Sequence, residues 1–296
     1  MGFVRFQSPY ALFAVLFGLQ FLVLLTRLVF FRQNSTDVRI ARQCLHDASF
    51  PYDNEDDFHK NIWPDLHRIA FLCSFKRFRK DVSTFGRGKH AVNWLNGKVT
   101  APEHKCNIIF LRNDSAVETE LDLKRRMSNC TVYSVSSELS SEDSRKPGSS
   151  IVSFVFNLEL YPQRWKPLDD ERDIRESMDI VKFISLETKL KRIDALNVFT
   201  NGAEHIRNLF SKSAFDTAKI RVCQLNLIYP RPRSKSTKQA FYDVWKRILY
   251  DRRYFLTSVR RLPNSDDLML FILNVSDPYC WAKYISLNIP FDPESA

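Results

Sequence analysis

Apolar residues occur in this chain as short continuous runs that alternate with helical stripes, from about residue 106 to residue 275. Continuous runs of this length, bounded by turn residues, are typical of strands that are buried on both faces of a sheet. Pro230 and Pro232 end one of these runs, because proline cannot donate to a strand ladder. The runs predict strands over residues 107–111, 131–135, 151–160, 195–199, 220–229, 254–262 and 268–275.

Between most of these strands, apolar residues recur at a spacing of three and four, which places them on one face of a helix. Ser115-Ala-Val-Glu118 is a capping box that opens the first helix. Strands that alternate with helices imply right-handed crossovers and a parallel sheet, and the loop over residues 263–267 joins the last two strands into an antiparallel hairpin. The pattern predicts helices over residues 115–127, 173–190, 203–212 and 240–249.

The first apolar segment differs from all the others. Residues 10–31 are apolar apart from Gln20, Thr26 and Arg27, and a membrane span needs about 20 such residues. The segment is long for a signal-peptide core of about 7–15 residues, and no small-residue cleavage site follows it. We therefore expect a transmembrane signal-anchor over residues 1–32, with a cleaved signal peptide as the alternative.

Two opposing signals bear on the orientation of this span. Arginines are more numerous after it than before it, which favours a cytosolic body. Glycosylation sequons favour a lumenal body; they begin at Asn34, Asn113, Asn129 and Asn274. Because single-span anchors of this length with a large C-terminal domain commonly face the lumen, we expect an endomembrane protein with a lumenal body.

The six cysteines are spread along the chain without a CxxC pair, so no zinc site is expected. Cys106 and Cys130 bracket one strand–helix unit, which would allow them to pair in an oxidising compartment; two unlinked thiols are the alternative. Cys223 lies in an apolar run and is expected to be a small, buried hydrophobic residue.

Composition and charge narrow the classes of function. A chain of 296 residues with 44% hydrophobic residues can bury a sizeable core. The net charge of +10 suits a membrane or glycan partner, but also a solvated basic surface. Nucleic-acid binding is not expected, since no helix-turn-helix or aromatic-rich single-strand motif is present. The basic residues that would form a glycan- or lipid-binding surface are Arg231, Arg233, Lys235, Lys238, Arg252, Arg253, Arg260 and Arg261.

The chain divides into three parts by composition. Residues 33–60 are polar and carry an acidic cluster, which indicates a stem, and the aromatic and basic stretch that follows indicates a flap. Stem and flap together span residues 33–100, and the main domain is expected over residues 101–290. No phosphate-loop pattern is present, and glycine is scarce, with seven residues.

Several stretches of the main domain, in a fixed order, resemble the FkbM-type methyltransferase-like family over about residues 106–286. The stretches are Lys191-Arg-Ile-Asp194 with Gly202-Ala-Glu204, then Arg221-Val-Cys-Gln-Leu-Asn226, Asp251-Arg-Arg-Tyr-Phe255, and Phe271-Ile-Leu-Asn-Val-Ser-Asp-Pro-Tyr-Cys280. The resemblance implies an α/β, class I methyltransferase-like (Rossmann-like) fold, whose mostly parallel seven-stranded sheet ends in an antiparallel hairpin. It also implies binding of S-adenosylmethionine and transfer of its methyl group to an oxygen nucleophile.

The resemblance places cofactor contacts at four positions. Asn113 and Asp114 follow the first strand, Ser136 ends the second, and Glu204 opens the helix after the glycine turn. Relatives carry an acidic residue at the position of Ser136, and serine lacks the charge-assisted hydrogen bonds of a carboxylate to the ribose. For Asp114 and Glu204, helix capping and the helix dipole are the alternative roles.

Other positions depart from the family. Phe110 and Arg112 stand where relatives have a glycine-containing loop, so their side chains would obstruct the cofactor, and the Arg112 cation would lie near its sulfonium. Phe199 and Asn201 replace an aspartate and a glutamate, and the strand that ends at Tyr229 lacks the usual glutamate and histidine.

These departures favour a membrane-anchored, catalytically degenerate methyltransferase-like protein that acts by binding a protein, glycan or lipid. One alternative is an active O-methyltransferase whose pocket is rebuilt with Asp114, Ser136 or Glu138, and Glu204. A basic glycan- or lipid-binding module is another. No catalytic residue or metal ligand is assigned.

Overall fold

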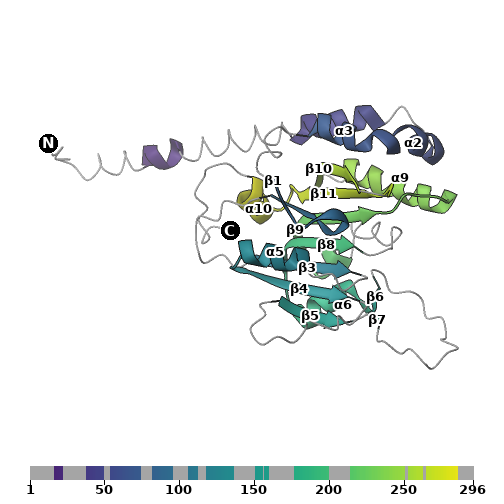
Figure 1. The fold of residues 1–296 in the computed structure, drawn as a ribbon. Helices are drawn as coiled ribbons and strands as arrows, with labels where there is room; N and C mark the ends of the chain where they lie inside the picture. Colours follow the sequence, from purple (N-terminus) through teal and green to yellow (C-terminus); the bar gives the residue numbers. More distant parts are fainter. Residues whose placement is uncertain are drawn as a thin grey trace, which may run out of the picture.

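The central feature of the molecule is one mixed β-sheet (Figure 1). The computed structural model describes residues 17–22, 38–49, 54–74, 82–95, 106–112, 118–136, 151–155, 157–159, 177–199, 214–250, 253–262 and 265–285. The strands of this sheet are β3 (Cys106–Arg112), β4 (Cys130–Ser136), β5 (Ile151–Val155), β8 (Arg192–Phe199), β9 (Arg221–Tyr229), β10 (Tyr254–Arg261) and β11 (Leu268–Asn274).

The order of the strands is β10-β11-β9-β8-β3-β4-β5. β3 runs parallel to β4 and β8, β5 is parallel to β4, and β9 is parallel to β8. Only β11 is antiparallel, and it lies between β9 and β10. The predicted α/β class, with a mostly parallel seven-stranded sheet and a C-terminal antiparallel hairpin, is therefore confirmed. The sheet is compatible with a Rossmann-like fold.

The helices follow the predicted alternation in part. They are α5 (Glu118–Arg126), α6 (Ile180–Phe183) with the π-helical turn η3 (Ile184–Thr188), α8 (Ala214–Thr217), α9 (Lys235–Tyr250), and α10 (Pro278–Cys280) with the π-helical turn η5 (Trp281–Ile285). The prediction of a helix over residues 173–190 was wrong at residues 177–179, which form the strand β7 (Ser177–Asp179) and pair with β6 (Asn157–Glu159). The helix predicted over residues 203–212 lies outside the described residues.

The residues interpreted as a stem and flap supply part of the core. A helix over residues 38–49 is followed by α2 (Glu55–Asn61), the 3-10 turn η1 (Trp63–Asp65) and α3 (Leu66–Cys73). Figure 1 shows this helical layer beside α9 and β10. Leu45, Phe58 and Leu66 are almost fully buried in the same core as Trp245 of α9. Burial of this apolar area is the main force that holds the layer on the sheet.

A small hairpin also packs on the sheet. It consists of β1 (Val82–Phe85) and β2 (Val92–Leu95), joined through the 3-10 turn η2 (Gly88–His90). Gly86 has a φ of 74°, and a Cβ there would lie 2.1 Å from Thr119 Oγ1, so only glycine fits where the hairpin crosses α5. The amide of Gly86 donates to Asp122 Oδ2 of α5 at 3.1 Å. The hairpin is therefore fixed against α5 as well as the sheet.

All six cysteines form disulfides, which are Cys44–Cys73, Cys106–Cys130 and Cys223–Cys280. Of the two alternatives left open for Cys106 and Cys130, the structure shows the pairing. Cys223 is buried as predicted, and its pairing with Cys280 was not predicted. The turn of α10 after β11 brings Cys280 beside β9, which the local pattern around Cys223 does not indicate.

The N-terminal apolar segment is described only over residues 17–22, which are helical. The large side chains there are exposed, including Phe17, Phe21 and Leu22. Within the described part of the chain, no helix is long and apolar enough to cross a membrane. The remainder of the predicted signal-anchor lies outside the described residues.

Candidate functional site

The carboxyl ends of the parallel strands form the edge at which α/β proteins bind ligands. β3, β4, β8 and β9 end there at Arg112, Ser136, Phe199 and Tyr229. Ser136 lies opposite Arg112 in the parallel register and is 7% exposed. The other predicted cofactor positions, Asn113, Asp114 and Glu204, lie outside the described residues, as does Glu138.

A buried ion pair lies at the end of β3. The Nε atom of Arg112 is 2.9 Å from Glu120 Oε1 of α5, although its N–H is not aligned as a hydrogen bond. The two side chains are only 4% and 1% exposed. Arg112 Nη2 donates to Ser134 Oγ at 2.8 Å, and Ser134 Oγ in turn donates to Glu120 Oε1 at 3.2 Å. The guanidinium is thus held between α5 and β4 and neutralised by a carboxylate.

Glu120 is the member of this cluster that the sequence analysis missed. The spacing along the helix could have identified it, since Glu120 lies three residues before Leu123 on the buried face of α5. Buried carboxylates require a partner. A glutamate on the buried face of a helix therefore indicates that another element supplies a cationic side chain. The sequence analysis considered the charge of Arg112 alone, whereas in the structure Glu120 compensates that charge.

Aromatic side chains fill the edge beside the ion pair. Phe110 is fully buried, and its ring centroid lies 6.2 Å from that of Phe199, the last residue of β8. His90, from the turn of the β1–β2 hairpin, meets Phe199 edge to face at 6.1 Å. The hairpin thus brings a third ring to the carboxyl end of β8.

A second aromatic cluster surrounds the end of β9. Tyr229 is fully buried, and its ring lies 4.7 Å from Phe241, which also contacts Trp63 at 4.7 Å. His59 stacks on Trp63 at 5.2 Å. Burial lowers the pKa of His59, and the nearby charges of Lys238 and Arg231 lower it further. This end of the strand is therefore apolar and lined by a histidine that favours its neutral form.

β8 places Asp194 near the opposite, amino edge of the sheet. Asp194 Oδ1 accepts hydrogen bonds from Lys283 Nζ and Tyr284 Oη, both at 2.6 Å, and Oδ2 accepts from the amide of Asn107 at 2.8 Å. Burial, with the charge of Asp194, raises the pKa of Tyr284 well above its usual value. Burial alone would lower the pKa of Lys283, but Asp194 outweighs it and raises that pKa. The network joins η5 to β8 and β3 of the sheet.

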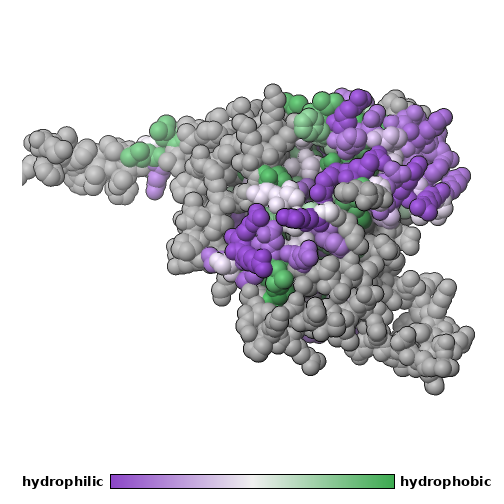
Figure 2. Space-filling view, in the orientation of Figure 1, coloured by the Kyte–Doolittle hydropathy of each residue, from purple (hydrophilic) through white to green (hydrophobic). Residues whose placement is uncertain are grey.

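The basic residues considered for a glycan or lipid surface mostly face carboxylates. Five of the eight have a partner within 4.0 Å: Arg231 and Arg261 with Asp266, Lys235 with Glu55, Lys238 with Asp56, and Arg253 with Asp216. Figure 2 shows hydrophilic side chains of this kind gathered over the end formed by α2 and α9. Because five of these cations are paired with carboxylates, the described part of this surface is mixed in charge.

Among the described residues, no group of histidine, cysteine, aspartate and glutamate side chains could hold a metal ion. Comparison with models of known protein families gives no match, and none of the curated proteins matches the chain either. The fold alone defines the class: an α/β protein whose mostly parallel seven-stranded sheet is compatible with a Rossmann-like fold.

Proposed function

We propose that this protein is a membrane-anchored, FkbM-type methyltransferase-like protein whose cofactor edge is closed and which acts by binding a partner. Numbered along the chain, the strands of the sheet lie in the order 3-2-1-4-5-7-6 from β5 to β10. Class I methyltransferases share this order, with the seventh strand antiparallel and inserted beside the sixth. The topology supports a methyltransferase-like scaffold, but a fold by itself does not assign chemistry.

The observation that carries the proposal is the buried cluster of Arg112, Glu120 and Ser134. In methyltransferases of this type a glycine-containing loop matches the segment that includes Arg112, and its backbone approaches the cofactor there. Here the position carries a large side chain with a matched carboxylate partner at 2.9 Å. Separating a buried ion pair is expensive, because each charge would be left without its partner in a poorly solvated site. A cofactor that displaced this side chain would have to offset that cost.

The direct test is calorimetry with S-adenosylmethionine on the full chain in lipid nanodiscs. We expect no binding up to about 1 mM, the upper end of ordinary KM values. Thermal melting of the same sample shows that the protein is folded. A dissociation constant well below this limit would overturn the proposal.

A second measurement separates this proposal from an active enzyme with a rebuilt pocket. Labelled S-adenosylmethionine is incubated with the protein and with extracts of glycans, lipids and proteins. The matched control is the variant Ser136→Trp, which fills the end of β4. Label transfer by the natural chain above that of the control would support the active enzyme instead.

We also propose that the body lies in the lumen and is anchored through residues 10–31. Its support is the pairing of all six cysteines, since structural disulfides persist in oxidising compartments and are rare in the cytosol. Protein expressed in eukaryotic cells is treated with a thiol-reactive polymer before and after reduction. The proposal predicts no modification before reduction and protection of the body from protease in intact microsomes. Cleavage of the body in sealed microsomes would contradict it.

A further inference from the structure

Asn129 lies in the turn that joins α5 to β4, at the amino edge of the sheet. The amide of Cys130 donates to the carbonyl of Met127 at 3.0 Å, and this bond closes a β-turn with Asn129 at its third position. Lys124 Nζ donates to the carbonyls of Ser128 and Cys130 at 2.8 Å and 2.5 Å. The turn is therefore held in place, and it presents an exposed asparagine.

This asparagine begins the sequon Asn129-Cys-Thr131, a pattern that accepts N-linked glycans. Its middle residue, Cys130, is buried and paired with Cys106. Thr131 lies within β4, opposite Asn107 of β3. Because β4 is enclosed between β3 and β5, a glycan-transferring enzyme has to act before these strands pair, while the segment is still accessible.

Asn129 can keep a glycan after the chain has folded. The hydrogen bonds that hold the turn are made by Lys124 and by the backbone of Met127, Ser128 and Cys130. A glycosylated asparagine also retains its Oδ1 acceptor and one N–H. The glycan therefore extends from an exposed position into solvent without breaking any of these bonds.

The other sequon within the described residues, Asn274-Val-Ser276, lies in the opposite environment. Asn274 is only 6% exposed, at the end of β11. Its Nδ2 atom donates to the Val222 carbonyl at 3.2 Å, and its Oδ1 atom accepts from the amides of Ser276 and Asp277 at 3.2 Å and 3.1 Å. A glycan is bulky and hydrophilic and belongs on a surface. A chain with a glycan on Asn274 could therefore not adopt this fold.

We propose that Asn129 is an N-glycosylation site and that Asn274, despite its sequon, is not. A lumenal enzyme joins Asn129 Nδ2 to the anomeric carbon of an oligosaccharide that is carried on a lipid diphosphate. The bond from that carbon to the diphosphate oxygen breaks, the lipid diphosphate leaves with the electron pair, and the amide loses one proton. This inference rests on the lumenal placement proposed above, because the glycan donor and the enzyme face the lumen.

The test uses the full chain purified from eukaryotic cells in its folded form. Peptides of this protein are deglycosylated by a peptide N-glycosidase in water labelled with heavy oxygen, which converts each glycosylated asparagine into a labelled aspartate. Mass spectrometry then locates the label in the sequence. We expect label at Asn129 and none at Asn274. An unlabelled Asn129, or a labelled Asn274, would overturn the proposal.

Variants separate the sequon from the asparagine itself. Thr131→Ser preserves the sequon and should retain the glycan, whereas Thr131→Val destroys the sequon and should lose one glycan, as Asn129→Gln should. Each loss appears as one step in mobility on a denaturing gel, which does not depend on folding of the variant. Ser276→Ala removes the sequon of Asn274 and should leave the mobility unchanged. A glycan retained at Asn129 in Thr131→Val, or a step lost in Ser276→Ala, would contradict the assignment.

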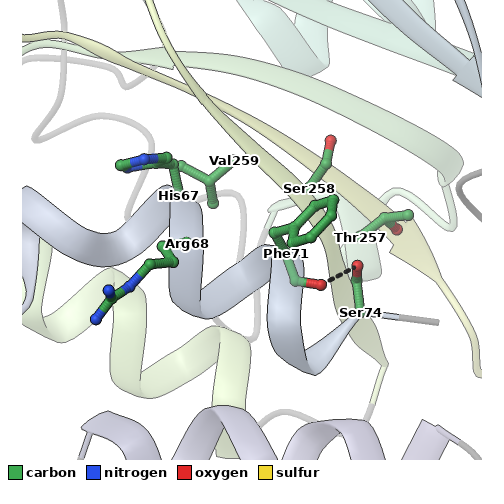
Figure 3. Close-up of a pocket in the computed structure, with 7 residues that line it drawn as sticks. All are labelled: His67, Arg68, Phe71, Ser74, Thr257, Ser258 and Val259. Carbon is green, nitrogen blue, oxygen red and sulfur yellow. Dashed lines mark hydrogen bonds between the residues drawn. The ribbon is translucent and has the colours of Figure 1, made fainter. Parts of the chain in front are cut away.

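Leu72→Asn is the matched control for access to the transferring enzyme. Leu72 is exposed on α3 and precedes Cys73 and Ser74, so the change creates a sequon whose middle cysteine is also paired, here with Cys44. Figure 3 shows Ser74 at this end of the helix, beside the pocket between α3 and β10. We expect one additional glycan in this variant.

The same control separates failure of the site from failure of the lumenal placement. A glycan on Leu72→Asn together with an unmodified Asn129 would overturn the site and leave the lumenal placement standing. If neither position is modified and protease cleaves the body in sealed microsomes, both proposals are wrong. Protection from protease with an unmodified Asn129 would overturn the site alone.

Discussion

The contribution of the Arg112–Glu120 ion pair to stability can be tested by substitution. Replacing Arg112 by methionine leaves the carboxylate of Glu120 buried without its cation. We expect this change to lower the free energy of unfolding by about 3–5 kcal/mol. Denaturant unfolding of the full chain, followed by near-UV circular dichroism, measures the loss.

The matched control removes both charges. The double variant Arg112→Met with Glu120→Leu replaces the pair with apolar side chains of similar size, which is often neutral or stabilising. The double variant should therefore recover most of the stability lost by Arg112→Met alone. A loss of less than about 1 kcal/mol in the single variant, as found for exposed pairs, would contradict the buried pair.

His59 provides a pH-dependent test at the end of β9. Its pKa is lowered in the folded protein, first by burial and then by Lys238 and Arg231. A histidine of this kind stabilises the fold fully above the unfolded pKa of about 6.5, and this contribution is lost as the pH falls through the folded pKa. We expect His59→Phe, which keeps a ring against Trp63, to lose less stability than the natural chain below about pH 6.5. Melting curves between pH 5 and 8 measure the difference, and parallel curves would contradict the prediction.

At the scale of elements, the hairpin β1–β2 is attached to β9 by side-chain amides. Leu95 N donates to Gln224 Oε1 at 2.8 Å, Asn93 N donates to Asn226 Oδ1 at 3.0 Å, and Asn226 Nδ2 donates to the Asn93 carbonyl at 2.9 Å. Gln224 and Asn226 are two residues apart, so both point to the same face of the sheet. The two amides therefore pair with β2 as a neighbouring strand would.

This attachment predicts a local effect of Asn226→Leu. The variant orphans the backbone N–H and C=O of Asn93, and each unsatisfied buried group costs about 1–3 kcal/mol. We expect hydrogen exchange of the Asn93 amide to accelerate more than that of the Leu95 amide, which Gln224 still holds. Thr84→Ala is the control, since it removes only an exposed bond to Asn93 Oδ1. Equal acceleration at both amides would indicate that the hairpin detaches as a whole and would contradict separate attachment.

The strands differ in how well the sequence predicted them. Long apolar runs predicted β3, β4, β8, β9 and β11 well, because burial on both faces imposes a continuous apolar pattern. The short strands β1, β2 and β7 were not predicted, since three or four residues carry no period and their pairing depends on tertiary contacts. β6 lies within the strand predicted over residues 151–160, but its pairing with β7 was not foreseen. In the site, Phe110 and Arg112 were predicted to obstruct the edge. Glu120, which completes the ion pair, was missed because its partner Arg112 lies on β3, and only the folded chain brings the two side chains together.

At the scale of the whole molecule, each disulfide fixes a different join of the fold. Cys44–Cys73 closes the N-terminal helical layer, Cys106–Cys130 joins β3 to β4, and Cys223–Cys280 ties α10 to β9. None of the three would be expected to form in a reducing compartment. The compartment and the stability of the folded chain are thus linked through the same bonds.

The disulfides close loops of different length. The sequence separation is 57 residues for Cys223–Cys280 and 29 for Cys44–Cys73. A disulfide stabilises chiefly by restricting the unfolded chain, typically by about 2–4 kcal/mol, and each doubling of the loop adds about 0.6 kcal/mol. Double replacement by serine should therefore cost more at Cys223–Cys280 than at Cys44–Cys73, since the longer loop is released. Denaturant unfolding of both variants beside the natural chain measures the order. A larger loss at Cys44–Cys73 would mean that the helical layer depends on its bond for packing, and not only for the restriction of the unfolded chain.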